Sequence, residues 1–480
     1  MSALDDIIQE RIAKKEKLIA KNINPYPEKV ERSVSIAETL EGFDILQADE
    51  KKIGVVGRVM SIREHGALIF LHLKENNSKI QVLIKKDTVS EEVFDLFREV
   101  VDIGDFIFVC GKVFVTKTNE KTIEALEWKM VTKTILPIPT EFYGLEDIEE
   151  KYRKRYLDLL INVDTKKIFD LRWKIISQIR EFLSRLDFVE VETPVLQPIY
   201  GGTLAKPFMT HLNELDMRVY LRIAPELYLK RVLIAGYTKI FELNKCFRNE
   251  SVDREHNPEF TMMELYQAFA SKEDLMQLIE NLIEYLGDKN ELPLLGGVSF
   301  PLKRIPIIDF VEEKSGLNYF KNSEQDFADY MQKNKIELEK GMSKAKMFDN
   351  VFKKFRVEII EPSFVIDHPI DLSPLAKAKD EDPRLASRFQ LLVKGLEVCN
   401  GWSELNDPAE QRARFEKQEE DKKAGDKEAH PYDKDFLEAL EYGMPMAAGV
   451  GIGIDRLVTI LTESSTLRDT ILFPFMKNNN

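Results

Sequence analysis

The feature that most constrains the fold is a change in hydrophobic periodicity near residue 137. Before this point, apolar and polar residues alternate in short runs, as they do in strands that bury one face. Five such runs occupy residues 53–60, 67–73, 79–84, 105–110 and 123–128. The stretch 91–100, between the third and fourth runs, has helical spacing instead. Together these elements predict a small β-barrel.

Five strands with one helix after the third are the layout of an oligonucleotide-binding (OB) barrel, although other short barrels share the strand count. Pro137 and Pro139 then mark a linker. Beyond the linker, amphipathic helices at 165–186 and 272–286 accompany strands in which polar residues alternate with apolar ones. The predicted strands are 219–223, 238–243, 259–266 and 391–399. Such strands favour an antiparallel sheet with one packed face and one working face.

We therefore predict an α+β protein, and 480 residues correspond to two or three domains. The predicted parts are a helical extension over 1–45, the OB barrel over 46–137, a linker over 138–150, and a second domain over 151–480 with a helical insertion around 281–354. The helix expected at 3–22 has a basic face, which is either a solvated surface or a contact to RNA.

The composition excludes several classes of protein. The net charge of −14 is too acidic for a general nucleic-acid coat, although it permits a local basic patch. Three widely spaced cysteines exclude a disulfide framework or a zinc knuckle and favour the reducing cytosol. Apolar runs of about 18 residues and an apolar signal core are both absent from the sequence. We therefore expect no membrane span and a cytoplasmic protein.

The first cluster of candidate site residues lies between residues 247 and 266. Two strands joined by a loop would place Arg248 and Glu264 on one face of the sheet. An arginine pairs with carboxylate or phosphate oxygens through two hydrogen bonds, and His256 adds a positive contact when it is protonated. Phe260 offers a flat face on which a base can stack. The alternative is an ordinary hairpin with paired surface charges, but the concentration of these residue types favours a site.

Two further clusters lie near the carboxyl end. Glu397, Asn400, Trp402 and Glu404 are spaced so that a strand and its turn could direct them into one pocket. The segment 449–456 reads Gly-Val-Gly-Ile-Gly-Ile-Asp-Arg, in which the glycines let a strand pass close to a ligand and the arginine begins a helix. The spacing differs from a dinucleotide-binding fingerprint, and the chain has no P-loop sequence.

In this order, the clusters resemble the three motifs of the class II aminoacyl-tRNA synthetases. The first motif corresponds to the long helix followed by 188–194, the second to 247–260 and the third to 451–456. An OB domain at the amino end narrows the resemblance to the subgroup that serves lysine, aspartate and asparagine. Within this subgroup the chain is most similar to the lysyl-tRNA synthetases, through residues 200–208, 221–230, 400–408 and 440–443.

The resemblance implies that lysine and ATP form lysyl-adenylate and pyrophosphate, and that lysine is then transferred to the 3′ end of tRNA(Lys). A carboxylate that attacks a phosphate meets a like charge, so catalysis depends on positioning and electrostatic compensation. The implied catalytic residues are Arg248, which bridges the lysine carboxylate and the α-phosphate, and Arg456, which stacks on adenine opposite Phe260. The implied ATP-binding residues are Arg248, Glu250, His256, Asn257, Phe260, Glu397 and Arg456.

Lysine carries two ammonium groups, and the resemblance implies an acidic partner for each. Glu226 and the backbone at Gly202 would bind the α-ammonium, whereas Glu264, Glu404 and Tyr266 would bind the ε-ammonium. The implied lysine-binding residues are Gly202, Glu226, Arg248, Glu264, Tyr266, Asn400, Trp402 and Glu404. Each carboxylate alone is equally consistent with a salt bridge on the surface of the sheet, but the complete set favours a site.

The resemblance also implies Mg²⁺, which prefers oxygen ligands, at Glu397 and Glu404. Gln390 stands where the family usually has another metal-binding glutamate, and its uncharged amide is a weaker ligand. We therefore expect a higher magnesium requirement than in related enzymes. The first motif usually forms a two-fold interface in this class, so we expect a homodimer.

In the OB barrel, the resemblance implies contacts to the anticodon from Arg63, Phe70 and Gln81. Aromatic stacking contributes about 1–3 kcal/mol per base, and arginine and glutamine add hydrogen bonds. Phe70 is equally consistent with packing in the barrel core. The expected partners are therefore tRNA(Lys), L-lysine and ATP.

Three other interpretations compete with this one. A related enzyme would join lysine to an acceptor other than tRNA, but the OB domain favours tRNA. A regulator derived from a synthetase would bind tRNA or nucleotide without catalysis, and Gln390 is its one support. The segment 341–344, Gly-Met-Ser-Lys, is similar to a phosphate-binding loop of class I synthetases. It lacks the partner His-x-Gly-His motif, so we interpret it as a chance match.

Overall fold

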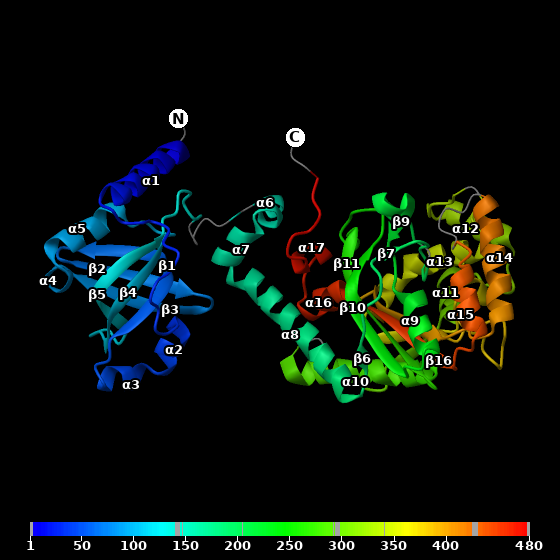
Figure 1. Cartoon of the computed structure of the whole chain (residues 1–480). Coiled ribbons are helices and arrows are strands. Elements are labelled where there is room, and N and C mark those ends of the chain that lie inside the picture. Colours follow the sequence, from blue (N-terminus) through cyan, green and yellow to red (C-terminus); the bar gives the residue numbers. More distant parts are fainter. Residues whose placement is uncertain are drawn as a thin grey trace. The chain divides into compact units, whose positions relative to one another are not determined.

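The computed structural model describes residues 3–139, 145, 147–203, 205–290, 292, 298–339, 341–424 and 431–477. The chain forms two compact units, Met1–Gly144 and Leu145–Asn480 (Figure 1). Part of the predicted linker, residues 140–144 and 146, lies outside the described residues. None of the helices in the described ranges is both long and apolar enough to span a membrane.

The first unit contains the predicted OB barrel, which the structure confirms. Its strands are β1 (Ile53–His65), β2 (Leu68–Glu75), β3 (Ser78–Lys85), β4 (Phe106–Val115) and β5 (Lys121–Thr132). They close in the order β1-β2-β3-β5-β4 (Figure 1). The helices of this unit are α1 (Ala3–Ala20), α2 (Ile36–Glu41), α3 (Phe43–Ala48), α4 (Lys86–Val89) and α5 (Glu91–Val100). Helix α5 is the one predicted after the third strand, and α4 is a further short helix that the sequence analysis did not predict.

The basic face of α1 is partly used to attach the helix to the barrel unit. Arg11 is buried and donates hydrogen bonds to Thr134 and to two backbone carbonyls. The Nζ atom of Lys14 lies 2.8 Å from Asp102 Oδ1, and that of Lys17 lies 2.5 Å from Glu99 Oε2. These contacts account for part of the charge pattern without a nucleic-acid partner.

The second unit is built on a sheet of eight strands in the order β12-β13-β14-β15-β16-β11-β10-β6. The strands are β6 (Val189–Glu190), β10 (Lys239–Phe247), β11 (Glu259–Ala268), β12 (Lys303–Pro306), β13 (Ser363–Ile366), β14 (Arg388–Val393), β15 (Leu396–Ser403) and β16 (Ala447–Gly453). Neighbours are antiparallel except at the two ends, where β6 pairs with β10 and β12 with β13 in parallel. The mixed α+β class is therefore confirmed.

A smaller sheet of three strands accompanies the large one. Its strands are β7 (Leu196–Gln197), β8 (Met209–Leu212) and β9 (Met217–Leu221). The helices of the second unit are α6 (Ile148–Arg153), α7 (Arg155–Ile161), α8 (Val163–Arg185), α9 (Glu226–Ile234), α10 (Lys272–Asn290), α11 (Ile307–Ser315), α12 (Glu324–Lys333), α13 (Lys344–Phe355), α14 (Pro408–Ala424), α15 (Lys434–Glu441), α16 (Ile454–Leu461) and α17 (Leu467–Thr470). Single 3₁₀ turns occupy Asn213–Leu215, Arg356–Glu358 and Ile370–Leu372.

Within the predicted insertion, α11, α12 and α13 pack around a core of their own. The Gly-Met-Ser-Lys segment lies at the start of α13, where Ser343 Oγ accepts a hydrogen bond from the backbone of Lys346 as an N-cap. The Nζ atom of Lys344 lies 4.9 Å from the centre of the Tyr319 ring. Both residues therefore have structural partners, which agrees with the interpretation of a chance match.

One face of the large sheet packs in the core and the other lines a cavity, because successive side chains of a strand point to opposite faces. Met263 and Leu265 of β11 and Val450 and Ile452 of β16 belong to one apolar core with α8, α10 and α16. Residues at the alternate positions, such as Glu264, line a cavity on the other face. Packing of the first face thus fixes the positions of side chains on the second.

The prediction of one strand over 391–399 is wrong, because the chain reverses inside that segment. Strands β14 and β15 form a hairpin whose turn residues, Lys394 and Gly395, have φ values of 50° and 75°. A Cβ on Gly395 would lie 2.7 Å from the Cα atom of Val357, so the turn needs glycine there. The apolar residues on either side obscure this turn in the sequence.

The alternating glycines of β16 hollow the sheet on its cavity face. Gly449, Gly451 and Gly453 occupy the positions between the core residues of that strand, and all three line the cavity. A Cβ on Gly449 would overlap the Tyr266 ring and Glu404 Oε1. The glycine spacing therefore makes space for a ligand and for two side chains beside it.

We expect Gly449→Ala to lower the free energy of unfolding by about 1–3 kcal/mol, because the added methyl group overpacks a dense site. Gly451→Ala is the matched control, since its Cβ would meet no protein atom closer than 3.5 Å. Thermal unfolding measures both variants. Equal melting temperatures for the two would contradict this account of Gly449.

Candidate active site

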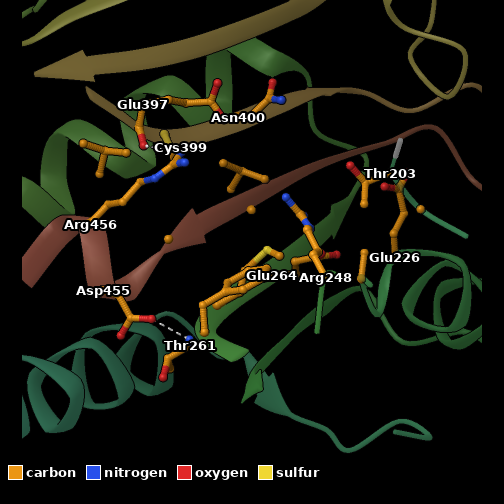
Figure 2. Close-up of a pocket in the computed structure, with 18 of the residues that line it drawn as sticks. Thr203, Glu226, Arg248, Thr261, Glu264, Glu397, Cys399, Asn400, Asp455 and Arg456 are labelled. Atoms are coloured by element: carbon orange, nitrogen blue, oxygen red, sulfur yellow. Dashed lines mark hydrogen bonds between the residues drawn. The ribbon is translucent and has the colours of Figure 1, made fainter. Parts of the chain in front are cut away.

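A cavity of about 230 Å³ lies on the working face of the large sheet, over β11, β15 and β16 (Figure 2). The strand register explains its floor. Glu264 is opposite Gly451, which is opposite Asn400, and Tyr266 is opposite Gly449, which is opposite Trp402. Side chains from the outer two strands thus approach each other across a row of glycines.

The acidic part of the cavity contains Glu226 and Glu264. Glu226 is the first residue of α9 and is 2% exposed, and Glu264 is 5% exposed. Gly202 lies against Glu226, and a Cβ there would lie 2.9 Å from the Cβ of Glu226. The hydroxyl of Tyr266 donates a hydrogen bond to Glu264 Oε2 (3.0 Å). These four residues, predicted to bind lysine, all line the same cavity.

Glu404 lies one layer behind the cavity wall. It is 1% exposed, and Trp402, which does line the cavity, donates its indole N–H to Glu404 Oε2 (2.8 Å). Lys230 Nζ lies 2.6 Å from the same oxygen and 2.6 Å from Glu226 Oε1. The other oxygen, Oε1, is buried without a hydrogen-bond partner among the described residues.

Burial changes the proton affinity of these acids, because a charged group loses its hydration there. Burial, together with the neighbouring Glu226, raises the pKa of Glu264 to about 8. Burial also raises the pKa of Glu226, and Lys230 opposes that shift. The pKa of Tyr266 is raised well above its ordinary value by burial and by the surrounding carboxylates. Glu264 therefore retains at neutral pH a proton that an exposed carboxyl group would release.

Arg248 follows the last residue of β10 and lies between the acidic end of the cavity and its other end (Figure 2). Its guanidinium carbon is 4.9 Å from the centre of the Phe260 ring. The Nε atom is buried without a hydrogen-bond partner among the described residues. Burial lowers the pKa of Arg248, so the side chain is a poorly solvated cation beside a flat aromatic face.

The loop between β10 and β11 carries the other residues of the first predicted cluster. Glu250 and His256 are exposed and line the cavity, and His256 Nδ1 lies 2.9 Å from Asp253 Oδ1. Asn257 is buried, and its amide donates to the backbone carbonyl of Glu259 and accepts from the backbone of Phe475. The amide of Asn257 therefore holds the loop in shape.

The far end of the cavity contains Arg456 and Glu397 (Figure 2). Arg456 lies in the first turn of α16 and donates to the backbone carbonyl of Glu397 (3.2 Å). A β-bulge between Glu397 and Cys399 shifts the register by one residue. Because a bulge changes the face on which the next side chain emerges, Glu397 joins Asn400 on the cavity face despite the odd spacing.

Gln390 is oriented by its two neighbours. The amide nitrogen of Gln390 donates to Glu397 Oε2 (2.8 Å), because a carboxylate oxygen only accepts. The amide oxygen of Gln390 therefore faces His368 Nε2 (3.1 Å). Burial lowers the pKa of His368 well below its ordinary range, so the ring is neutral and donates from Nε2. The oxygen of Gln390 is thus occupied by His368, and Gln390 does not line the cavity.

The sequence analysis assigned no role to the Asp455–Arg172 pair or to Lys230, although the site depends on both. Asp455 accepts a hydrogen bond from the backbone of Thr261 (2.8 Å) and forms an ion pair with Arg172 of α8 (2.7 Å). This buried pair connects all three motif segments. Lys230 is the second omission, and its spacing of four residues from Glu226 on one helix is a signal that could have found it.

In the OB barrel, Arg63 on β1 is directly opposite Phe70 on β2. The strand β2 alternates between buried and half-buried residues, and Phe70 falls on the outer face with His72. Packing in the barrel core is therefore wrong for Phe70. Gln81 is opposite His72, and its amide donates to Glu120 Oε2 (2.8 Å).

Comparisons with known proteins agree with this geometry. A family model described as tRNA synthetases class II (D, K and N) matches residues 147–477, and one described as an OB-fold nucleic acid binding domain matches residues 53–131. The chain therefore belongs to the class II tRNA synthetases of the D, K and N group.

Similar proteins with this architecture carry a specific name. Two proteins named lysine–tRNA ligase, from Carboxydothermus hydrogenoformans and Thermotoga maritima, are each 43% identical to this chain. The similarity covers 99% of this chain and, respectively, 98% and 96% of the length of the two proteins. One named lysine–tRNA ligase 2, from Methanosarcina mazei, is 42% identical over 100% of this chain and 95% of its own.

Glu264→Gln should raise the dissociation constant for lysine at least about 30-fold, because removing one partner of a buried charge pair costs about 2–5 kcal/mol. Calorimetric titration of lysine measures the change. Glu259→Gln is the matched control, since Glu259 is exposed on the same strand and does not line the cavity. If the two variants bound lysine equally well, Glu264 would not contact the ligand.

Proposed function

We propose that this chain is a lysine–tRNA ligase, which activates L-lysine with ATP and transfers it to tRNA(Lys). The observation that carries the proposal is the pairing of two buried carboxylates, Glu226 and Glu264, with the cation Arg248 in one cavity. A free lysine molecule has two ammonium groups and one carboxylate, so its charges complement these three groups. The full-length similarity to proteins named lysine–tRNA ligase supports the same conclusion.

Lysine binds with its α-ammonium between Glu226 and the backbone at Gly202. Its ε-ammonium lies at Glu264, whose position the Tyr266 hydroxyl fixes, with Glu404 behind. Trp402 covers the aliphatic stem, and Asn400 is held nearby by a hydrogen bond from Arg388 (3.0 Å). The site rejects uncharged analogues because a buried carboxylate left without a partner is costly.

ATP occupies the other end of the cavity. Arg248 contacts both the lysine carboxylate and the α-phosphate, and so offsets the repulsion that opposes the attack. Adenine stacks between Phe260 and Arg456, while Glu250 contacts the nucleotide and Asn257 holds the loop around it. His256 reaches the outer phosphates when it is protonated. The carboxylate oxygen then attacks the α-phosphorus, and pyrophosphate leaves.

Mg²⁺ fits Glu397, because this ion binds to one or two carboxylates together with substrate phosphates and water. When bound, the ion neutralises charge on the phosphates. The oxygen of Gln390 accepts a hydrogen bond from His368, and Gln390 does not line the cavity, so we assign it no metal. We assign no metal to Glu404, because the Lys230 ammonium already lies 2.6 Å from it. The single carboxylate supports the expected higher magnesium requirement.

The barrel binds the anticodon of tRNA through Arg63, Phe70 and Gln81.

A homodimer is proposed through the first motif segment, where Trp173, Val189, Val195 and Leu196 are 41–51% exposed. Large apolar side chains exposed in one segment of the chain are consistent with an interface. The proposed reaction supplies lysine-charged tRNA for protein synthesis, so we place the enzyme in the cytoplasm.

The decisive test is ATP–pyrophosphate exchange in the presence of lysine, ornithine, arginine, aspartate or asparagine. We expect stimulation by lysine, with ornithine well below it, because a shorter stem cannot reach both acidic groups. Charging of tRNA(Lys) is then measured with the same preparation. Stimulation by aspartate would overturn the specificity, and exchange without charging would indicate another acceptor.

Phe70→Ala should raise KM for tRNA(Lys) about 5–150-fold, the equivalent of about 1–3 kcal/mol for one stacked base. Exchange with lysine should be unchanged, because no tRNA takes part in that step. Val115→Ala, at an exposed position of β4, is the control. A wild-type KM for tRNA in the Phe70 variant would refute the stacking role.

A further inference from the structure

Lys230 is a buried cation to which the reaction described above assigns no role. It lies one helical turn after Glu226 on α9, and its side chain is 0% exposed. Its Nζ atom is 2.6 Å from Glu226 Oε1 and 2.6 Å from Glu404 Oε2. Lys230 therefore bridges two carboxylates that are far apart in the sequence and that lie on different elements.

Each of these carboxylates has one oxygen tied and one oxygen directed at the cavity wall. Glu404 Oε2 contacts Lys230 and the Trp402 indole, whereas Oε1 has no hydrogen-bond partner among the described residues and lies against Gly449. Glu226 Oε1 contacts Lys230, whereas Oε2 lies 3.6 Å from the position that a Cβ on Gly202 would take. Both glycines line the cavity.

We propose that Lys230 is a positioning residue, which tethers one oxygen of Glu226 and one of Glu404 and so presents the other oxygen of each to the ammonium groups of the substrate. This inference rests on the proposed function. The untethered oxygens lie beside two glycines that line the cavity, Gly202 and Gly449, where the α- and ε-ammonium groups of the proposed substrate bind. Lys230 thus ties the two acidic ends of the pocket to one point.

The charged groups that interact with Lys230 come from two elements: Glu226 lies one turn earlier on α9, and Glu404 follows β15. On β11, Glu264 interacts with Glu226, and Tyr266 interacts with both carboxylates. Arg231 is already paired with Asp433 at 3.2 Å, so Lys230 is the cation available to the buried carboxylates on its side of α9. Without it, Glu226 and Glu404 face Glu264 in a site that water does not hydrate.

Removal of the Lys230 charge has a specific consequence. Lys230 opposes the rise that burial causes in the pKa of Glu226 and Glu404, so without it both carboxyls retain their protons to higher pH, and a protonated carboxyl attracts an ammonium group only weakly. Loss of Lys230 should therefore weaken lysine binding most at low pH, and less as the pH rises and the carboxyls ionise. A residue that only supports the fold would weaken the binding of lysine and of ATP together, without this pH dependence.

The test is calorimetric titration of the full-length chain with lysine and with ATP at pH 7.0 and pH 8.5. Lys230→Met removes the charge and keeps the approximate length of the side chain. Lys133→Met is the matched control, because Lys133 is also 0% exposed and bridges two carboxylates, Asp102 and Asp105, in the barrel unit. Lys230→Gln, which can still donate a hydrogen bond, replaces the Met variant if the latter does not fold.

We expect Lys230→Met to weaken lysine binding at least tenfold at pH 7.0, with a smaller deficit at pH 8.5 and ATP affinity within twofold of wild type. Lys133→Met should leave both affinities unchanged. Lysine affinity within twofold of wild type at both pH values would overturn the inference, as would a parallel loss for lysine and ATP. Failure of the wild-type chain to bind lysine would instead refute the proposed function itself.

Discussion

The site depends on the burial of three carboxylates, two of which, Glu226 and Glu404, are bridged by the ammonium group of Lys230. Glu226, Glu264 and Glu404 are each at most 5% exposed, and Lys230 is the cation among them. With Arg248 included, the formal charges leave one negative charge in excess, and free lysine carries one net positive charge. Burial raises the pKa of Glu264 and of Glu404 to about 8, so these carboxyls retain protons at neutral pH. We propose that the ammonium groups of lysine replace these protons.

The fold makes this arrangement possible through a division between the two faces of one sheet. Residues such as Met263, Leu265 and Val450 anchor the strands in the helical core, so the alternate positions are held rigidly on the other face. Gly449 and Gly451 interrupt the side chains there and form the hollow. The site is therefore a consequence of the core: the same strand pairing that buries the apolar residues sets the acidic groups in register.

Much of this could be predicted from residues alone. Alternation of apolar residues predicted the barrel, and the dense clusters around Arg248 and the glycine segment predicted the cavity. The hairpin at Lys394 was missed, because a two-residue turn between apolar strands has a weak signal. Glu397 reaches the cavity through a bulge that spacing does not reveal. The spacing of Lys230 from Glu226 on α9 is visible in the sequence, but its contact with Glu404, which is distant in the chain, shows only in the tertiary structure.

The central claim is that lysine displaces protons from buried carboxyls. Its most direct test is calorimetric titration of lysine at pH 7.0 in buffers of different ionisation enthalpy, which measures the protons exchanged on binding. The account predicts a net release of protons, because Glu264 and Glu404, each with a pKa of about 8, are mostly protonated at that pH. Binding of lysine without proton exchange, or with proton uptake, would contradict it.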